Sequence, residues 1–246
     1  MEEAVDARTG DSPNGLVAVV VRFAQSSIGA KMVMALTGFA LWAFMVVHLA
    51  ANLQMFAGPE GVNSYGASLR EMPALLWGAR LGLIGVFVVH IASAIRCAQL
   101  NRAARPTAYA FAPRTPVRAP AVTMLLTGLV VLSFLAYHIA HFTWRLTGPQ
   151  PDLTVAFHER LVHDVYSMVL AGFQVPWIAA FYVVGQLLLA SHLSHGLYSM
   201  FQHLGLHGEK TWTPFVKTAA NTIAWGMCAA FCSIPLAVLF GLIKAP

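Results

Sequence analysis

The sequence predicts an all-α integral membrane protein, built as a five-helix bundle. Of its 246 residues, 58% are hydrophobic and only 10% are charged, and the mean hydropathy of +0.66 lies outside the soluble range. Five apolar segments are each long enough to cross a hydrocarbon core of about 30 Å. A chain of this length can hold these spans and little else, so no soluble catalytic domain is expected.

The five predicted transmembrane helices are, in chain order, residues 31–51, 77–97, 121–144, 175–201 and 218–243. We expect residues 1–25 to form a polar or amphipathic N-terminal segment and 26–246 to form a single membrane domain. The N-terminal segment lacks the basic start and apolar core of a signal peptide, so we expect it to be retained. The connecting stretch 156–172 looks amphipathic and is predicted to lie along the outer surface.

The distribution of basic residues predicts the orientation of the bundle. Of the 15 lysines and arginines, ten fall on the N-terminal side of the predicted membrane and five on the other. Because basic residues concentrate in cytoplasmic loops, the N-terminus is predicted to lie in the cytoplasm. The pI of about 9.4 then reflects topology, and we expect membrane lipid and no nucleic acid as a partner.

Four spans each carry a histidine deep inside apolar sequence: His48, His90, His138 and His192. At 1.5 Å per residue, His48 and His138 lie roughly 8–10 Å outward of the helix centres, and His90 and His192 roughly 4–6 Å inward. A single intramembrane histidine could simply bond a backbone carbonyl, but such residues are costly in lipid and are usually functional. Four of them at two levels predict two bis-histidine haems held between helices.

Two further histidines, His141 and His195, lie one helical turn beyond His138 and His192. Depth favours His192 over His195 as a ligand, but it does not separate His138 from His141. The chain contains no CxxCH motif, which excludes c-type haem attachment. No span places a carboxylate or thiolate near these histidines at a spacing typical of zinc sites, so zinc is disfavoured.

From about Ser26 to its C-terminus the sequence resembles a known family. The resemblance rests on SSIGAKMVMALTG and VVHLAANL in the first span, VNSYGASLR in the first outer loop, VVHIASA in the second span and ARPTAY after it, FLAYHIAHFT in the third, SHLSHGLYSMFQHLG in the fourth, and VKTAANTIA and SIPLAVLFG in the fifth. The chain is similar to the cytochrome b membrane-anchor subunit of bacterial succinate:quinone oxidoreductases (succinate dehydrogenase or fumarate reductase). The resemblance is to the single-polypeptide, two-haem b558 type.

The resemblance implies that the first histidine of each doublet is the ligand. It pairs His48 with His138 at an outer haem and His90 with His192 at an inner haem, so the cofactors are two b haems and a quinone, expected to be menaquinone. It also implies flavoprotein and iron–sulfur partner subunits on the cytoplasmic face of a bacterial inner membrane, with a higher oligomer of the complex as an option. Some fumarate-reducing members carry a glutamate at the position of Ala190, and its absence here disfavours fumarate reduction.

Two groups of polar residues are further site candidates. The first would contact haem propionates or support the ligands: Ser27, Lys31, Arg96, His141 and His195. The second would supply protons to quinone near the outer haem: Asn52, Gln54, Tyr65, Arg70 and Glu71. The alternatives are ordinary cytoplasmic anchoring for the basic residues of the first group, and a solvated loop with a short interfacial helix for the second.

Two other functions fit part of the pattern. A diheme cytochrome b of a nitrate reductase, formate dehydrogenase or hydrogenase also holds its haems with histidines of the membrane helices, but it lacks the HLSHGLYS and VNSYGASLR motifs. A haem-free anchor or transporter could use the same histidines as a proton relay. An optical spectrum separates the second alternative, and the identity of co-purifying subunits separates the first.

Overall fold

The structure, a computed structural model, describes residues 13–104, 119–149, 151, 154–157, 160–206, 208, 210 and 212–245. It is 84% helical, and five helices are long and apolar enough to cross a membrane. They are α2 (Ser27–Leu53), α4 (Pro73–Ala103), α5 (Ala119–His138), α7 (Pro176–His203) and α8 (Trp212–Leu239). The predicted fold class is confirmed: the chain is an all-α, multi-pass membrane protein.

Most helix ends lie a few residues beyond the predicted spans, because a helix can continue with polar residues past the hydrocarbon core. Counting the π-helical extension of α5, the end of α8 falls furthest short, since the helix stops at Leu239 and the prediction ran to 243. There Gly241 adopts a φ of 69°, the N–H of Leu242 bonds the Ala237 carbonyl at 2.8 Å and the N–H of Gly241 bonds the Val238 carbonyl at 3.0 Å. This is a Schellman end, which a glycine forms without a Cβ penalty.

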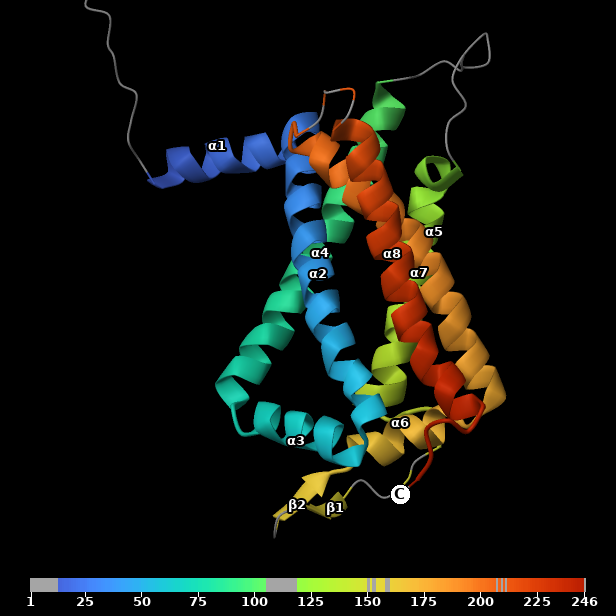
Figure 1. Cartoon of the computed structure of the whole chain (residues 1–246). Helices are drawn as coiled ribbons and strands as arrows, with labels where there is room; N and C mark the ends of the chain where they lie inside the picture. Colours follow the sequence, from blue (N-terminus) through green and yellow to red (C-terminus); the bar gives the residue numbers. More distant parts are fainter. Residues whose placement is uncertain are drawn as a thin grey trace, which may run out of the picture.

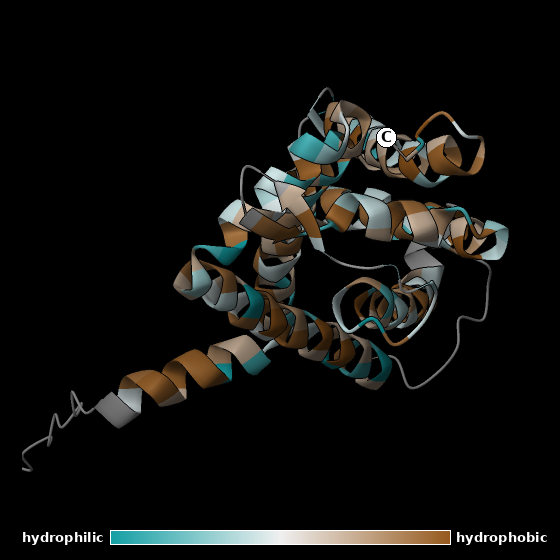
Figure 2. Ribbon diagram, turned by 90° about the horizontal axis from the view of Figure 1, so that it is seen from below, coloured by the Kyte–Doolittle hydropathy of each residue, from teal (hydrophilic) through white to brown (hydrophobic). Residues whose placement is uncertain are grey.

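The long helices form two groups (Figure 1). Helix α2 packs on α4, α7 packs on α8 and α5, and α2 joins the groups by packing on α7. We call the end where α2 begins the inner end and the opposite end the outer end, following the predicted orientation. Seen along the bundle, apolar residues, drawn in brown, cover much of the long helices (Figure 2), and many of their large side chains are exposed, as contact with lipid requires.

Helix α1 (Pro13–Gln25) leaves the inner end at a steep angle to the bundle (Figure 1). The turn into α2 depends on Ser26, whose Oγ accepts the Gly29 N–H at 3.0 Å and donates to the Phe23 carbonyl at 2.7 Å. A Cβ on Gly29 would overlap that carbonyl, so only glycine allows this reversal. The exposed Leu16, Val17 and Val20 give α1 an apolar surface suited to the membrane interface.

The outer end is closed by short elements: the 3₁₀ turn Gln54–Ala57, α3 (Pro59–Arg70), the antiparallel hairpin of β1 (Thr154–Phe157) and β2 (Arg160–His163), and α6 (Val165–Phe173). The described part of the stretch 156–172 lies at the outer end, but it does not form one amphipathic surface segment. The segment is divided between the hairpin and α6, which packs against α3, α7 and α8. Six of the nine α6 residues are buried, because the helix is apolar on more than one face.

A buried asparagine connects α3 to α6. Asn63 is 1% exposed; its Nδ2 donates to Asp164 Oδ1 at 3.0 Å, and its Oδ1 accepts the Tyr166 N–H at 3.0 Å. Asp164 also caps α6 by accepting the Ser167 N–H at 3.0 Å. Burial raises the pKa of Asp164. The hydrogen bonds from Ser167 and Asn63 and the nearby His163 lower this pKa by more, so the net shift is downward.

Replacing Asn63 by alanine is expected to destabilise the outer end by about 2 kcal/mol, because it leaves the Tyr166 N–H without a partner and removes one of the donors to the Asp164 carboxylate. Thermal unfolding of the purified protein in detergent measures the loss. Ser68→Ala is the matched control, since the Ser68 hydroxyl bonds only its own helix at Ser64. Equal melting temperatures of the wild type and Asn63→Ala at pH 7 would contradict this role of Asn63.

The stabilising contribution of the Asp164 carboxylate depends on pH. It is present above the unfolded pKa near 4 and is lost as the pH falls through the lower folded pKa.

Candidate functional site

Two histidines from different helices face one another in the outer half of the bundle. The ring centroids of His48 on α2 and His138 at the end of α5 are 5.9 Å apart, with planes at 89°. Two metal–imidazole bonds of about 2.0 Å each, with the ring radii added, separate two centroids by about 6 Å. Phe44 stacks on His48 at 5.5 Å and Phe134 lies 6.2 Å from His138. The spacing therefore fits one metal centre with two axial imidazoles.

A second pair lies between α4 and α7. His90 and His192 are close enough to interact electrostatically, and each ring meets a threonine of a neighbouring helix. His90 Nδ1 is 3.1 Å from Thr37 Oγ1 on α2, and His192 Nδ1 is 3.1 Å from Thr127 Oγ1 on α5. In both cases a threonine of a neighbouring helix contacts the Nδ1 edge of the ring.

Glycines next to these threonines lie against the inner rings. A Cβ on Gly38 would lie 3.3 Å from His90 Cε1, and a Cβ on Gly128 would lie 3.5 Å from His192 Cε1. The Gly38 contact is tighter than most carbon contacts, so a larger residue would push the His90 ring away from its helix. Gly38 therefore makes room for the His90 ring, whereas a Cβ at Gly128 would make only an ordinary van der Waals contact with His192.

The structure separates the two members of the outer doublet. The ring that faces His48 is His138, whereas His141 is 3% exposed in a π-helical turn, Ile139–Thr143. Tyr182 Oη lies 3.1 Å from His141 Nδ1 and 3.4 Å from His138 Nδ1, so it links the two histidines. A Cβ on Gly148 would lie 2.7 Å from His141 Nε2, which shows how tightly His141 is enclosed.

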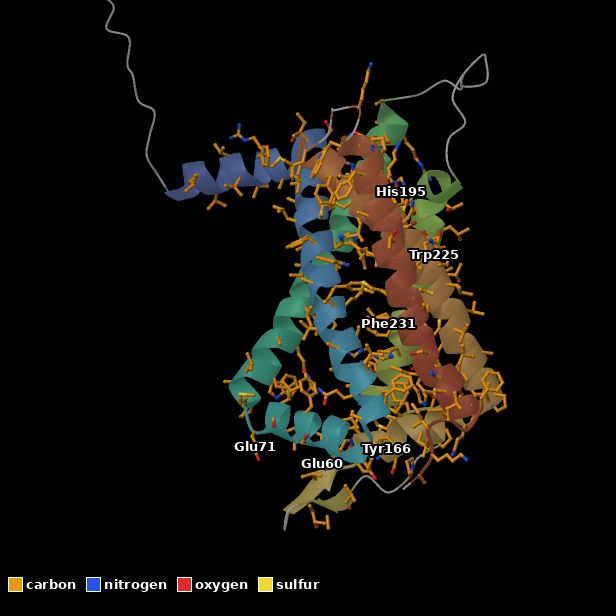
Figure 3. All side chains as sticks on the ribbon, viewed as in Figure 1. Glu60, Glu71, Tyr166, His195, Trp225 and Phe231 are labelled. Atoms are coloured by element: carbon orange, nitrogen blue, oxygen red, sulfur yellow. The ribbon has the colours of Figure 1, made fainter. Side chains whose placement is uncertain are left out.

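The inner-end candidates lie around the start of α2. His195 projects near this end (Figure 3) and interacts electrostatically with His203, as Lys31 does. Arg96 Nε donates to the Gln25 carbonyl at 3.2 Å and so ties α4 to the α1–α2 junction. Ser27 is the first residue of α2. Arg96 therefore has a structural contact between helices, and the other candidates lie near the same end of the bundle.

The outer-end candidates extend from the end of α2 to the end of α3. Asn52 Nδ2 donates to the His48 carbonyl at 2.7 Å, so this side chain bonds the helical turn that carries His48. Gln54 packs against Gly61, since a Cβ there would be 3.3 Å from Gln54 Oε1. Tyr65 is half-buried on α3, while Arg70 and Glu71 are exposed, and Glu71 marks the outer rim in Figure 3.

A histidine outside the predicted site joins this outer group. Burial lowers the pKa of His163, and the positive charges of Arg70 and Arg145 lower it further against the opposing charge of Asp164. His163 is therefore neutral at pH 7 and can accept a proton beside Arg70. Its position at the end of β2 could not be inferred, because the hairpin itself was not predicted.

Sequence reasoning also missed Thr37, Thr127 and Tyr182. A signal for the threonines was present, since residues 34–50 and 124–140 share the pattern Met-x-Leu-Thr-Gly-x₅-Phe-x₃-His-x-Ala. Each copy carries an outer-pair histidine, the phenylalanine beside it, and a threonine–glycine step that contacts an inner-pair histidine. Tyr182 has no comparable signal, because its role depends on how α7 is rotated against α5.

Comparison with protein-family models, with curated proteins and with solved structures found no match. What the fold and the site define is a class: a multi-pass helical membrane protein with two pairs of intramembrane histidines. The function therefore has to be argued from these pairs and from the motifs.

Proposed function

We propose that the protein is the diheme cytochrome b membrane-anchor subunit of a bacterial succinate:quinone oxidoreductase (respiratory complex II), located in the cytoplasmic membrane. The observation that carries this proposal is the arrangement of four intramembrane histidines as two cross-helix pairs. Among the described residues no group of three or more His, Cys, Asp or Glu gathers as a metal site. A haem needs only two axial residues, because its macrocycle supplies the other four nitrogens.

The residues fit a haem at each level. His48 and His138 would hold the outer haem, and His90 and His192 the inner one; bound there, haem iron supplies one-electron transfer. The chain holds the imidazoles in place, excludes water with apolar helices and so sets the environment that tunes the potential. The inner end would receive electrons from an iron–sulfur subunit that is itself served by a flavoprotein.

A quinone, expected to be menaquinone, would bind at the outer end. Asn52 bonds the helical turn that carries His48, and Gln54, Tyr65, Arg70 and Glu71 follow it along the capping elements. Quinone reduction consumes protons, and neutral His163 beside Arg70 adds a proton-exchanging group at the same end. Ala190 is 2% exposed and packs with Cys228 and Cys232; an apolar contact there provides no carboxylate for proton conduction, which favours succinate oxidation.

The proposal is tested by adding succinate to membranes that contain the protein and recording the optical spectrum. Succinate should reduce a b-type cytochrome, and malonate, which competes with succinate, should block the reduction. The tagged chain should co-purify with a flavoprotein and an iron–sulfur subunit. A b-type spectrum that responds to formate, hydrogen or nitrate but not to succinate would assign the chain to another quinone-linked enzyme. The absence of any haem would favour a transporter or a simple anchor.

A further inference from the structure

The two inner-pair histidines are held by the same device, repeated in two helices. A threonine hydroxyl has one proton to donate, and both threonines give it to their own helix. Thr37 Oγ1 lies 2.7 Å from the Val33 carbonyl and 3.2 Å from that of Met34. Thr127 Oγ1 lies 3.1 Å from the Met124 carbonyl. Towards the histidines, each hydroxyl oxygen can therefore only accept.

With the hydroxyl protons placed on these carbonyls, the tautomer of both rings follows. If Thr37 accepts at 3.1 Å, the proton of His90 must sit on Nδ1, and the same holds for His192 and Thr127. In the neutral ring the other nitrogen, Nε2, then carries the lone pair. A metal-bound imidazole that donates its second N–H becomes more basic, which stabilises the higher oxidation state of the metal.

We propose that Thr37 and Thr127 are positioning residues that hold His90 and His192 as Nε2 ligands and lower the potential of the inner haem; this rests on the proposed function. The repeat supports the assignment independently, since the same Leu-Thr-Gly step occurs at 36–38 and 126–128 and each copy meets a different inner histidine. The outer pair differs: the His138 Nδ1 contact with Tyr182 is longer, at 3.4 Å.

The two threonines should not be equal. The Met34 carbonyl also lies near enough to act on the His90 ring, so Thr37→Val leaves a polar backbone group beside that ring. His192 has no second acceptor of this kind among the described residues, so Thr127→Val removes its only one. We expect Thr127→Val to raise the midpoint potential of the inner haem. At a fixed solution potential, the ferric-to-ferrous ratio should fall about five-fold. At 59 mV per ten-fold for one electron this is about 40 mV. Thr37→Val should give a smaller shift in the same direction.

Optical redox titration of the purified complex tests this, with the haem content of every variant measured in parallel. Thr127→Ser, which keeps the hydroxyl, should behave as wild type. Ser133→Ala is the matched control on α5, because the Ser133 hydroxyl bonds only the Leu129 carbonyl at 3.0 Å; it should shift neither haem.

The possible results distinguish a failure of this inference from a failure of the proposed function. Two haems with unchanged potentials in both valine variants would overturn the inference and leave the proposed function standing. If Thr127→Val fails to hold the inner haem, Thr127→Ser must restore both the haem and its potential, and a serine variant that behaves like valine would also overturn it. A wild-type chain without haem would refute the proposed function itself.

Discussion

Replacing either histidine of the outer pair is expected to remove one haem from each chain. His48→Ala and His138→Ala take away one of two axial imidazoles that stand 5.9 Å apart, and the remaining imidazole cannot keep the haem in a six-coordinate, low-spin state. The haem content should fall from about two per chain to about one in each variant. The double variant should lose no more, because the two residues act as a unit.

The neighbouring histidines provide the controls. His141→Ala should keep both haems with a shifted outer potential, because its hydrogen-bond link to the pair runs through Tyr182. His195→Ala should also keep both, and His163→Ala, at the outer surface, should alter neither haem. The pairing would be wrong if His48→Ala and His138→Ala lost spectroscopically different haems, or if the double variant lost both.

The second large effect concerns the place where electrons leave the protein. Arg70→Ala or Glu71→Gln at the end of α3 should slow succinate:quinone activity at least ten-fold, a barrier increase of about 1.4 kcal/mol. Succinate oxidation by an artificial acceptor at the soluble subunits should remain, because that route bypasses the membrane. Ser68→Ala, on the same helix, removes a hydroxyl that bonds only Ser64 and should leave both activities unchanged.

This exit site also predicts a response to membrane potential. Electrons that enter at the inner end and leave at the outer end cross much of the bilayer, and moving one charge across 100 mV costs about 2.3 kcal/mol. Turnover in energised vesicles should therefore depend on the potential. If quinone activity survives every outer-end change but falls when Ser27, Lys31 or Arg96 is altered, the quinone binds at the inner end instead.

The membrane architecture was largely predictable from the sequence. Hydropathy registers a lipid-facing helix directly, so all five spans were located, with errors confined to their ends. The end of α8 was misplaced because the φ of Gly241 stops the helix inside apolar sequence. The hairpin and α6 were missed because 156–172 reads as one amphipathic stretch, whereas α6 is buried by packing against α3, α7 and α8.

The sequence predicted how deep each site residue lies in the bundle, but not which way its side chain faces. Counting residues along each span placed His48 with His138 and His90 with His192, because a helix rises by a constant amount. Depth could not choose between His138 and His141, which differ mainly in the direction they face. Thr37 and Thr127 were not predicted for the same reason: hydrogen bonds between helices depend on how each helix is rotated about its axis.

The central claim is that this chain binds two non-covalent b haems. The most direct test is a pyridine haemochrome assay on the purified protein, combined with acid-acetone extraction. The account predicts about two haems per chain, all removed by extraction because the sequence contains no CxxCH, and a low-spin reduced-minus-oxidised spectrum. A value near one would contradict the two-pair assignment, and a value near zero would contradict the proposed function altogether.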